Sequence, residues 1–210
     1  MTLLELRTLF RLRAGDTAAP YLWADAEIDG YLNDAENEAA ERASLIYDDS
    51  SAATSIATVI GTKRYTVAAD MIRLDYAELT DPPSTEAQPL AIADRREYGP
   101  RAIFLIPDSN DIELNFIPAI VGALHIGMYR MPLAAMALDA DVPEIAAKHH
   151  RKLIDWALHL AYLKQDADAF DQTKADRHEA EFIANFGQRI DANVKRKQRE
   201  RRRHVVRCNW

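Results

Sequence analysis

The sequence predicts an α+β protein: mainly an α-helical bundle of two N-terminal and two C-terminal helices, with an inserted antiparallel β region and a basic C-terminal tail. Long amphipathic stripes over about residues 25–47 and 144–164 indicate the bundle. Short apolar runs separated by turn formers, between residues 55 and 131, indicate the insertion. The expected parts are N-terminal helices in 1–54, a β insertion in 55–132, a C-terminal helical hairpin in 133–194 and the tail in 195–210.

The N-terminal part carries two expected helices. The first spans residues 3–13, because Thr2 and Glu5 form a capping box and Gly15 follows as a helix breaker. The second spans residues 25–47 and has acidic side chains in its first turn, where the helix dipole favours negative charge. In both helices apolar residues recur at steps of three and four, which places them on one inward face. These residues are Leu3, Leu6 and Phe10, then Ile28, Leu32, Ala35, Ala39, Ala43 and Ile46.

The middle of the chain is expected to form an antiparallel β region of five or six strands. Its apolar runs are short, and residues that favour turns separate them. The separating residues are Gly61, Asp81-Pro82-Pro83, Gly99-Pro100, Pro107-Asp108-Ser109-Asn110 and Pro118. Residues 94–98 are compatible with a single helical turn within this region.

The C-terminal part carries the other two expected helices. Pro143 is expected to open the third, because proline is tolerated in a first turn, and the helix runs to about Lys164. Two apolar stripes predict that it is buried on two sides, with Trp156 on the inner face. Asp168 is the expected N-cap of the fourth helix, whose apolar pattern fades into the tail.

The net charge of −7 divides into two opposite parts. Residues 195–210 hold eight of the 26 Lys and Arg and a single acid, Glu200, so this segment carries +7. The other 194 residues hold 18 basic and 32 acidic side chains, and their net charge is −14. We therefore expect the body to repel nucleic acid and the tail to seek an anionic partner.

No catalytic, cofactor-binding or metal-binding residue is predicted, and we expect a protein that is not an enzyme. The chain has no Gly-x-Ser-x-Gly, P-loop or Gly-x-Gly-x-x-Gly motif. His149 and His159 are ten residues apart, which is not a metal-ligand spacing, and Asp155 with His159 is expected to form an ordinary helix pair.

The sequence also predicts no contact with a membrane. No window approaches eighteen consecutive apolar residues, and the N-terminus lacks the basic and apolar regions of a secretory signal. The single cysteine, Cys208, cannot form an internal disulfide, which fits assembly in a reducing cytoplasm.

The tail is the candidate partner-binding site, and three interpretations of it stay open: a solvated arm, docking on an acidic protein surface, and contact with DNA phosphates. Docking is favoured, because apolar residues near the end of the tail would anchor better in a protein pocket than on a phosphate backbone. The site comprises Lys195, Arg196, Lys197, Arg199, Arg201, Arg202, Arg203, Val205, Val206, Arg207 and Trp210.

Four segments in this order resemble the head–tail adaptor (connector) family of tailed bacteriophages. They are residues 6–16, residues 23–35 with their tryptophan and Leu-Asn-x-Ala core, residues 65–74 and residues 142–161. The resemblance covers about residues 3–190 and leaves the basic tail outside the shared pattern. Ala24 and Ala68 depart from that pattern, which has a Ser or Thr cap and a proline at these positions.

The resemblance implies a structural protein of the virion, located at the head–tail interface and assembled in the host cytoplasm. It implies a ring, commonly of twelve copies, that binds the portal protein and a tail or nozzle protein. DNA would pass through the lumen without specific binding, and the acidic body agrees with that passage. No cofactor comes with the family. The competing hypothesis is a small DNA-binding or packaging factor that acts through the basic tail.

Overall fold

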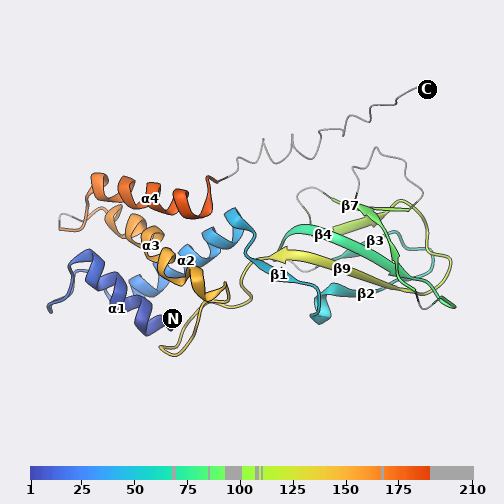
Figure 1. Cartoon of the computed structure of the whole chain (residues 1–210), viewed down its shortest axis with the longest axis horizontal. Helices are drawn as coiled ribbons and strands as arrows, with labels where there is room; N and C mark the ends of the chain where they lie inside the picture. The colour runs from blue at the N-terminus through green and yellow to red at the C-terminus, as the bar shows by residue number, and fades with distance from the viewer. Residues whose placement is uncertain are drawn as a thin grey trace, which may run out of the picture. The chain divides into compact units, whose positions relative to one another are not determined.

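The computed structural model describes residues 1–67, 70–84, 86–92, 101–106, 109, 111–166 and 168–189. Four α-helices lie in these ranges: α1 (Leu3–Ala14), α2 (Asp25–Ala43), α3 (Leu153–Tyr162) and α4 (Gln172–Phe186) (Figure 1). Two short 3₁₀ helices, η1 (Ala52–Thr54) and η2 (Ala147–Lys152), accompany them. Nine strands lie in the same ranges: β1 (Ile46–Asp48), β2 (Ser55–Ala57), β3 (Arg64–Thr66), β4 (Met71–Thr80), β5 (Gln88–Pro89), β6 (Ala91–Ile92), β7 (Ala102–Leu105), β8 (Asp111–Leu114) and β9 (Ala123–Arg130).

The expectation of a mainly helical bundle is wrong: the protein is α+β with two sheets and substantial strand content. The strands of one sheet follow the order β1-β9-β4-β5, and β2 also pairs with β9. The other sheet has the order β3-β8-β7-β6. The pairs β1–β9, β2–β9, β3–β8, β4–β5 and β7–β8 are antiparallel, whereas β6 and β7 are parallel.

Two predicted helices are shorter than their apolar stripes suggested. α2 ends at Ala43, because Ser44 adopts a left-handed conformation with φ of 50°. Ile46, the last member of its stripe, lies in β1 opposite Arg130 of β9 and is buried there. The third helix does not open at Pro143. Its first turns are the 3₁₀ helix η2, and regular α-helix begins only at Leu153.

The chain divides into two compact units. The helical unit comprises Met1–Thr54, Ala68–Asp75 and Ile126–Gln188, and the strand unit consists mainly of Ser55–Val67 and Tyr76–His125. The division falls within β4 and within β9, so each of these strands contributes residues to both units.

The core of the helical unit confirms the predicted inward faces of the first two helices except at Ala43, which is exposed. Leu3, Leu6 and Phe10 of α1 are fully buried, and so are Ile28 and Leu32 of α2. Trp23, which precedes α2, is 1% exposed and stands edge-on to Phe10 and Tyr162, with ring centroids 5.6 and 5.8 Å away. Burial of these large apolar groups is the main stabilising contribution in this unit.

Helix caps define where two of the helices begin. Thr2 and Glu5 form the predicted capping box of α1: the Thr2 hydroxyl accepts from the Glu5 N–H, and the Glu5 carboxylate accepts from the Thr2 N–H. The N-cap of α4 is Asp171, not Asp168, and its carboxylate accepts from the Lys174 N–H at 3.0 Å. Both caps satisfy backbone donors that the first turn of a helix leaves free.

Candidate partner-binding surfaces

The predicted tail site lies outside the described residues. This applies to all its members: Lys195, Arg196, Lys197, Arg199, Arg201, Arg202, Arg203, Val205, Val206, Arg207 and Trp210. The candidate binding surfaces among the described residues lie on the two units.

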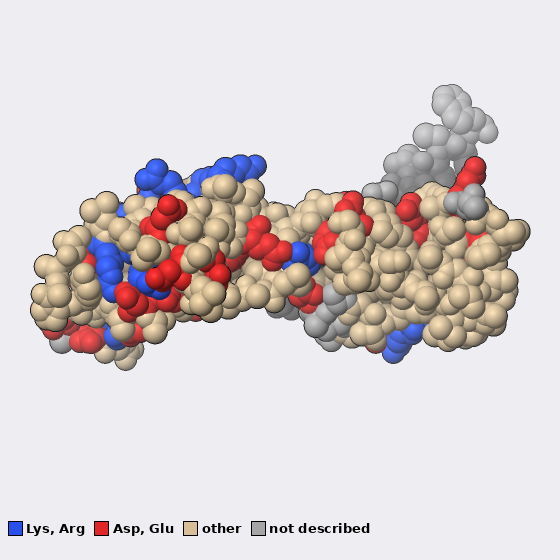
Figure 2. Space-filling model, turned by 90° about the horizontal axis from the view of Figure 1, so that it is seen from below, with Lys and Arg blue, Asp and Glu red and all other residues tan. Residues whose placement is uncertain are grey.

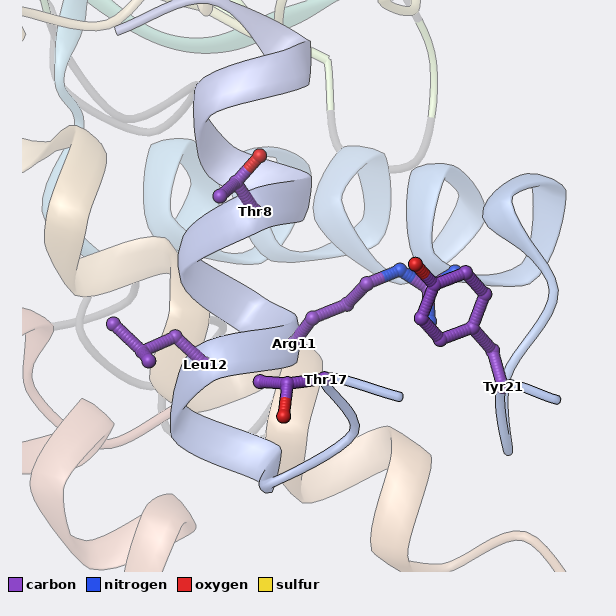
Figure 3. A pocket seen from close by; sticks show the side chains of 5 residues that line it. All are labelled: Thr8, Arg11, Leu12, Thr17 and Tyr21. Atoms are coloured by element: carbon purple, nitrogen blue, oxygen red, sulfur yellow. The ribbon is translucent and has the colours of Figure 1, made fainter. Parts of the chain in front are cut away.

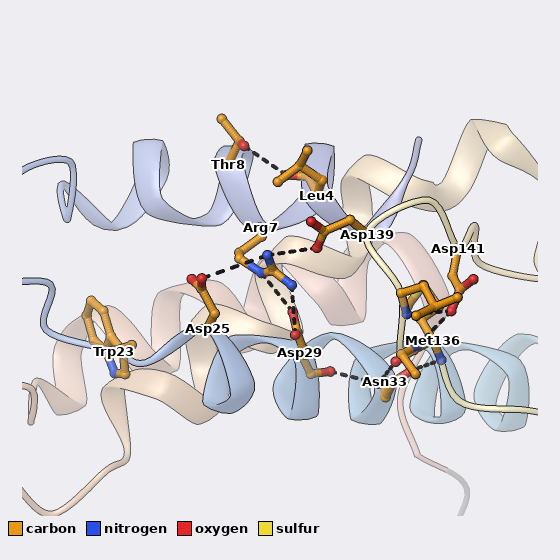
Figure 4. Close-up of polar contacts among 12 residues, drawn as sticks. Leu4, Arg7, Thr8, Trp23, Asp25, Asp29, Asn33, Met136, Asp139 and Asp141 are labelled. Atoms are coloured by element: carbon orange, nitrogen blue, oxygen red, sulfur yellow. Dashed lines mark hydrogen bonds and ion pairs between the residues drawn. The ribbon is translucent and has the colours of Figure 1, made fainter.

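Arg7 of α1 joins three segments of the helical unit through its guanidinium group (Figure 4). It donates to both carboxylate oxygens of Asp29 in α2, at 3.0 and 2.8 Å, and to Asp139 in the loop that follows β9, at 3.1 Å. The hydrogen bond to Asp29 is the main reason that the pKa of Arg7 is raised above its usual value. Arg7 is therefore a positioning group within the fold, with its charge already neutralised.

Arg11, one turn further along α1, positions the loop that leads to α2. It contacts Asp16 and Asp25 at 2.6 Å each and donates to the Trp23 carbonyl at 2.9 Å. The hydrogen bond from Arg11 holds the pKa of Asp25 below its usual range. Asp25, which lies in the first turn of α2 where the helix dipole favours negative charge, thus also pairs with α1. Glu27 of the same turn pairs instead with Lys164, at 2.6 Å.

A cavity of about 340 Å³ lies against α1 and is lined by Thr8, Arg11, Leu12, Thr17 and Tyr21. The Tyr21 ring lies against the guanidinium end of Arg11, whose central carbon is 3.9 Å from the ring centroid (Figure 3). Because the Arg11 charge is paired, what the cavity offers a ligand is chiefly apolar and hydroxyl surface. Sequence reasoning did not find this cavity, because no motif marks it.

A second arginine, Arg130 of β9, organises the other end of the helical unit. It donates to Asp48 of β1 at 3.0 Å and forms a very short contact with Glu144. The bond from Arg130 is the main reason that the pKa of Glu144 lies below its usual range. Glu36 of α2, 2% exposed, accepts from the N–H groups of Glu144 and Ile145 at 2.6 and 3.3 Å, and burial raises its pKa.

The histidines have structural positions. His150 is buried, with Nε2 2.8 Å from the Ile145 carbonyl oxygen and Nδ1 2.8 Å from the Met1 amine. Asp155 does not pair with His159 as expected: it contacts Arg13 at 3.1 Å and His178 at 3.2 Å, while His159 Nδ1 lies 3.0 Å from the Ala175 carbonyl. Across the described ranges, no group of three or more His, Cys, Asp or Glu side chains could hold a metal ion.

On one face of the molecule, charge is distributed differently over the two units. On the face that Figure 2 shows, red and blue side chains are interleaved on the helical unit, in agreement with the ion pairs of Arg7 and Arg11. The described face of the strand unit is mainly uncharged in the same view. Among the described helices, none is both long enough and apolar enough to cross a membrane.

The comparisons with known proteins identify a family. The family model described as SU10 adaptor protein matches residues 1–207, which is nearly the whole chain. The match therefore includes most of the basic segment, which the resemblance seen in the sequence had left outside the shared pattern. A search of curated proteins found no match. Since the match covers far more than half of its length, the chain belongs to the SU10 adaptor protein family, a family of structural bacteriophage proteins.

Proposed function

We propose that the protein is the head–tail adaptor of a tailed bacteriophage: a ring, of twelve copies, that joins the portal to the tail around the DNA channel of the virion. The observation that carries this proposal is the family match over residues 1–207. An adaptor role requires contacts with other head or tail proteins and no chemistry. The paired arginines Arg7, Arg11 and Arg130 are consistent with that, because their charges hold the fold together.

The charge of the body supports passage of DNA through such a ring. Residues 1–194 carry a net charge of −14, and like charge keeps a DNA phosphate backbone from adhering to a protein wall. A lumen lined by cations would instead bind DNA and slow its movement.

We assign the attachment of the ring to its head-side partner, the portal protein, to residues 195–210. Eight basic side chains in sixteen residues supply attraction to an acidic groove. This attraction should weaken as the salt concentration rises, because salt screens exposed charges. Val205, Val206 and Trp210 would then set the register, because charge steers a contact but specifies it poorly. The family match through residue 207 supports a role for this segment that relatives share.

The test is attachment of purified protein to portal-bearing heads that lack the adaptor. Truncation after Ile190 should abolish attachment while the body stays folded, and Arg201, Arg202 and Arg203 changed together to Glu should nearly abolish it. Trp210→Ala should weaken attachment less.

Normal attachment of the truncated protein, together with loss of DNA binding, would replace this function with that of a small DNA-binding or packaging factor. Cryo-electron microscopy of loaded heads tests the ring directly, and a class average without rotational symmetry at the portal would exclude it.

A further inference from the structure

The two longest stretches of the chain without Asp, Glu, Lys or Arg are residues 50–62 and 114–129, in a protein of which 28% is charged. Nothing in the sequence indicates that they meet. In the structure the Thr58 N–H donates to the Gly122 carbonyl at 2.9 Å, and the Gly61 N–H donates to the Pro118 carbonyl at 3.1 Å. The Gly122 N–H returns a bond to the Thr58 hydroxyl at 2.7 Å. Residues 58–62 and 117–122 thus form one feature of the strand unit, the apolar tip.

Large aliphatic side chains cover the apolar tip. Five of them are between 40 and 60% exposed: Val59, Ile60, Ile117, Ile120 and Val121. Single exposed aliphatic residues are common on any protein and need no explanation. Here five exposed aliphatic side chains lie on two hydrogen-bonded turns that contain no charged residue. Such a patch is typical of a surface that another molecule covers.

The apolar tip also has a fixed shape. The buried Tyr65 places its hydroxyl inside the first turn, where it accepts from the Val59 N–H at 3.1 Å and donates to the Thr62 carbonyl at 2.8 Å. In the second turn, a Cβ atom added at Gly122 would lie 2.5 Å from the Thr80 carbonyl oxygen, so the turn packs directly on β4. A surface that is rigid before binding loses little conformational entropy when it docks.

These properties indicate the chemistry of the occupant. DNA or an anionic lipid would require a cluster of cations, but residues 58–62 and 117–122 carry none. Of the two cations that follow the first turn, Lys63 is exposed and Arg64 pairs with Glu113 at 3.6 Å. A fluid bilayer does not require a fixed shape, whereas a protein pocket does.

We propose that the apolar tip docks in an uncharged, apolar pocket of a protein on the tail side of the particle. The inference rests on the proposed adaptor function, in which the basic C-terminal segment makes the head-side contact. The two contacts then differ in their physics. Salt screens the charged contact, whereas burial of aliphatic side chains persists or strengthens in kosmotropic salt.

The test uses particles of a phage that lacks its own adaptor, supplied with full-length protein and then with its tails. The tip variant is Ile60→Ser with Val121→Ser. The matched control is Leu133→Ser with Leu138→Ser, which changes two side chains of the helical unit that are 69 and 68% exposed. We expect the tip variant to load onto heads like the unchanged protein and to join tails at least tenfold less, while the control joins them normally.

Several outcomes would overturn the inference. One is that the tip variant joins tails as well as the unchanged protein does. Another is that the control variant loses as much tail joining as the tip variant, which would indicate a general effect of surface apolarity. Loss of the tip variant from heads would assign the tip to the head side. Tip-dependent flotation with phosphatidylcholine vesicles, or tip-dependent self-association in sedimentation velocity, would assign it to lipid or to a second copy. If the unchanged protein itself fails to load onto heads, the proposed function fails and not the tip.

Discussion

Glu36 shows at the scale of one residue how burial and hydrogen bonding compete. Its carboxylate accepts from two backbone N–H groups in the core of the helical unit, yet burial raises its pKa. A raised pKa in the folded state means that the contribution of this group to stability is fully present below the pKa of the unfolded chain. That contribution is lost as the pH rises through the folded-state pKa.

Glu36→Gln removes this titration while keeping an oxygen that can accept the same bonds. The unchanged protein should lose stability as the pH rises from 4 to 7, whereas the variant should not lose this contribution. We therefore expect the free energy of unfolding of the variant to increase relative to that of the unchanged protein over this range. Urea titrations at several pH values measure this difference. A constant difference across that range would show that the pKa of Glu36 is not raised.

Trp156 is a second residue whose environment the structure revises. The sequence placed it on an inner face, but it is half-buried, with centroids 4.8 Å from His159 and 5.0 Å from Phe182, and with Arg42 above its ring. We expect Trp156→Ala to cost about 1–3 kcal/mol, and Trp23→Ala, at a fully buried site, about 3–5 kcal/mol. Equal costs in urea unfolding would contradict the difference in burial.

At the scale of an element, α1 is the clearest case in which local sequence determines a helix. Its capping box, apolar face and terminal glycine all agree, and Gly15 adopts the left-handed φ of 77° that favours glycine. Thr2→Ala should destabilise the protein by about 1 kcal/mol, because it leaves a first-turn N–H without its acceptor. Thr8→Ala, in the same helix but not at a cap, is the control and should be near neutral in thermal unfolding.

The third helix shows the opposite case. Its apolar stripe is continuous from Ile145, but the N–H groups of Glu144 and Ile145 donate to Glu36 of α2. The chain next to them bends into the 3₁₀ helix η2, where His150 contacts the Ile145 carbonyl. Periodicity reports which side chains face inward, and it does not report which backbone groups a distant residue binds.

At the scale of the whole molecule, the separation of charge has a direct consequence for DNA binding. The body is acidic and residues 195–210 are basic, so any affinity for DNA should reside in that segment. Protein truncated after Ile190 should bind duplex DNA at least tenfold more weakly than the full chain in a low-salt gel-shift titration. Undiminished binding would locate a DNA site on the body and weaken the argument for an open channel.

The sequence by itself determined the inward faces of α1 and α2, the first cap, the division of charge and the likeness to phage adaptors that the family match confirms. These features depend on neighbours within a few positions, or on composition, so they can be predicted from periodicity and spacing. The candidate surfaces could not be predicted in this way, because the residues that form them are far apart in the chain. Arg7 and Asp139 are 132 residues apart in the chain, and the two turns of the apolar tip are about 60 apart.

Only the tertiary structure decided the strand content and the pairing of the strands. Ile46 continues the stripe of α2 and yet pairs with Arg130 in a sheet, because the partner strand β9 supplies backbone bonds that the helix would otherwise make. Short apolar runs are compatible with either sheet and with parallel or antiparallel neighbours, as β6 and β7 show. Pairing between distant strands depends on the whole arrangement of the chain, and no local pattern in the sequence encodes it.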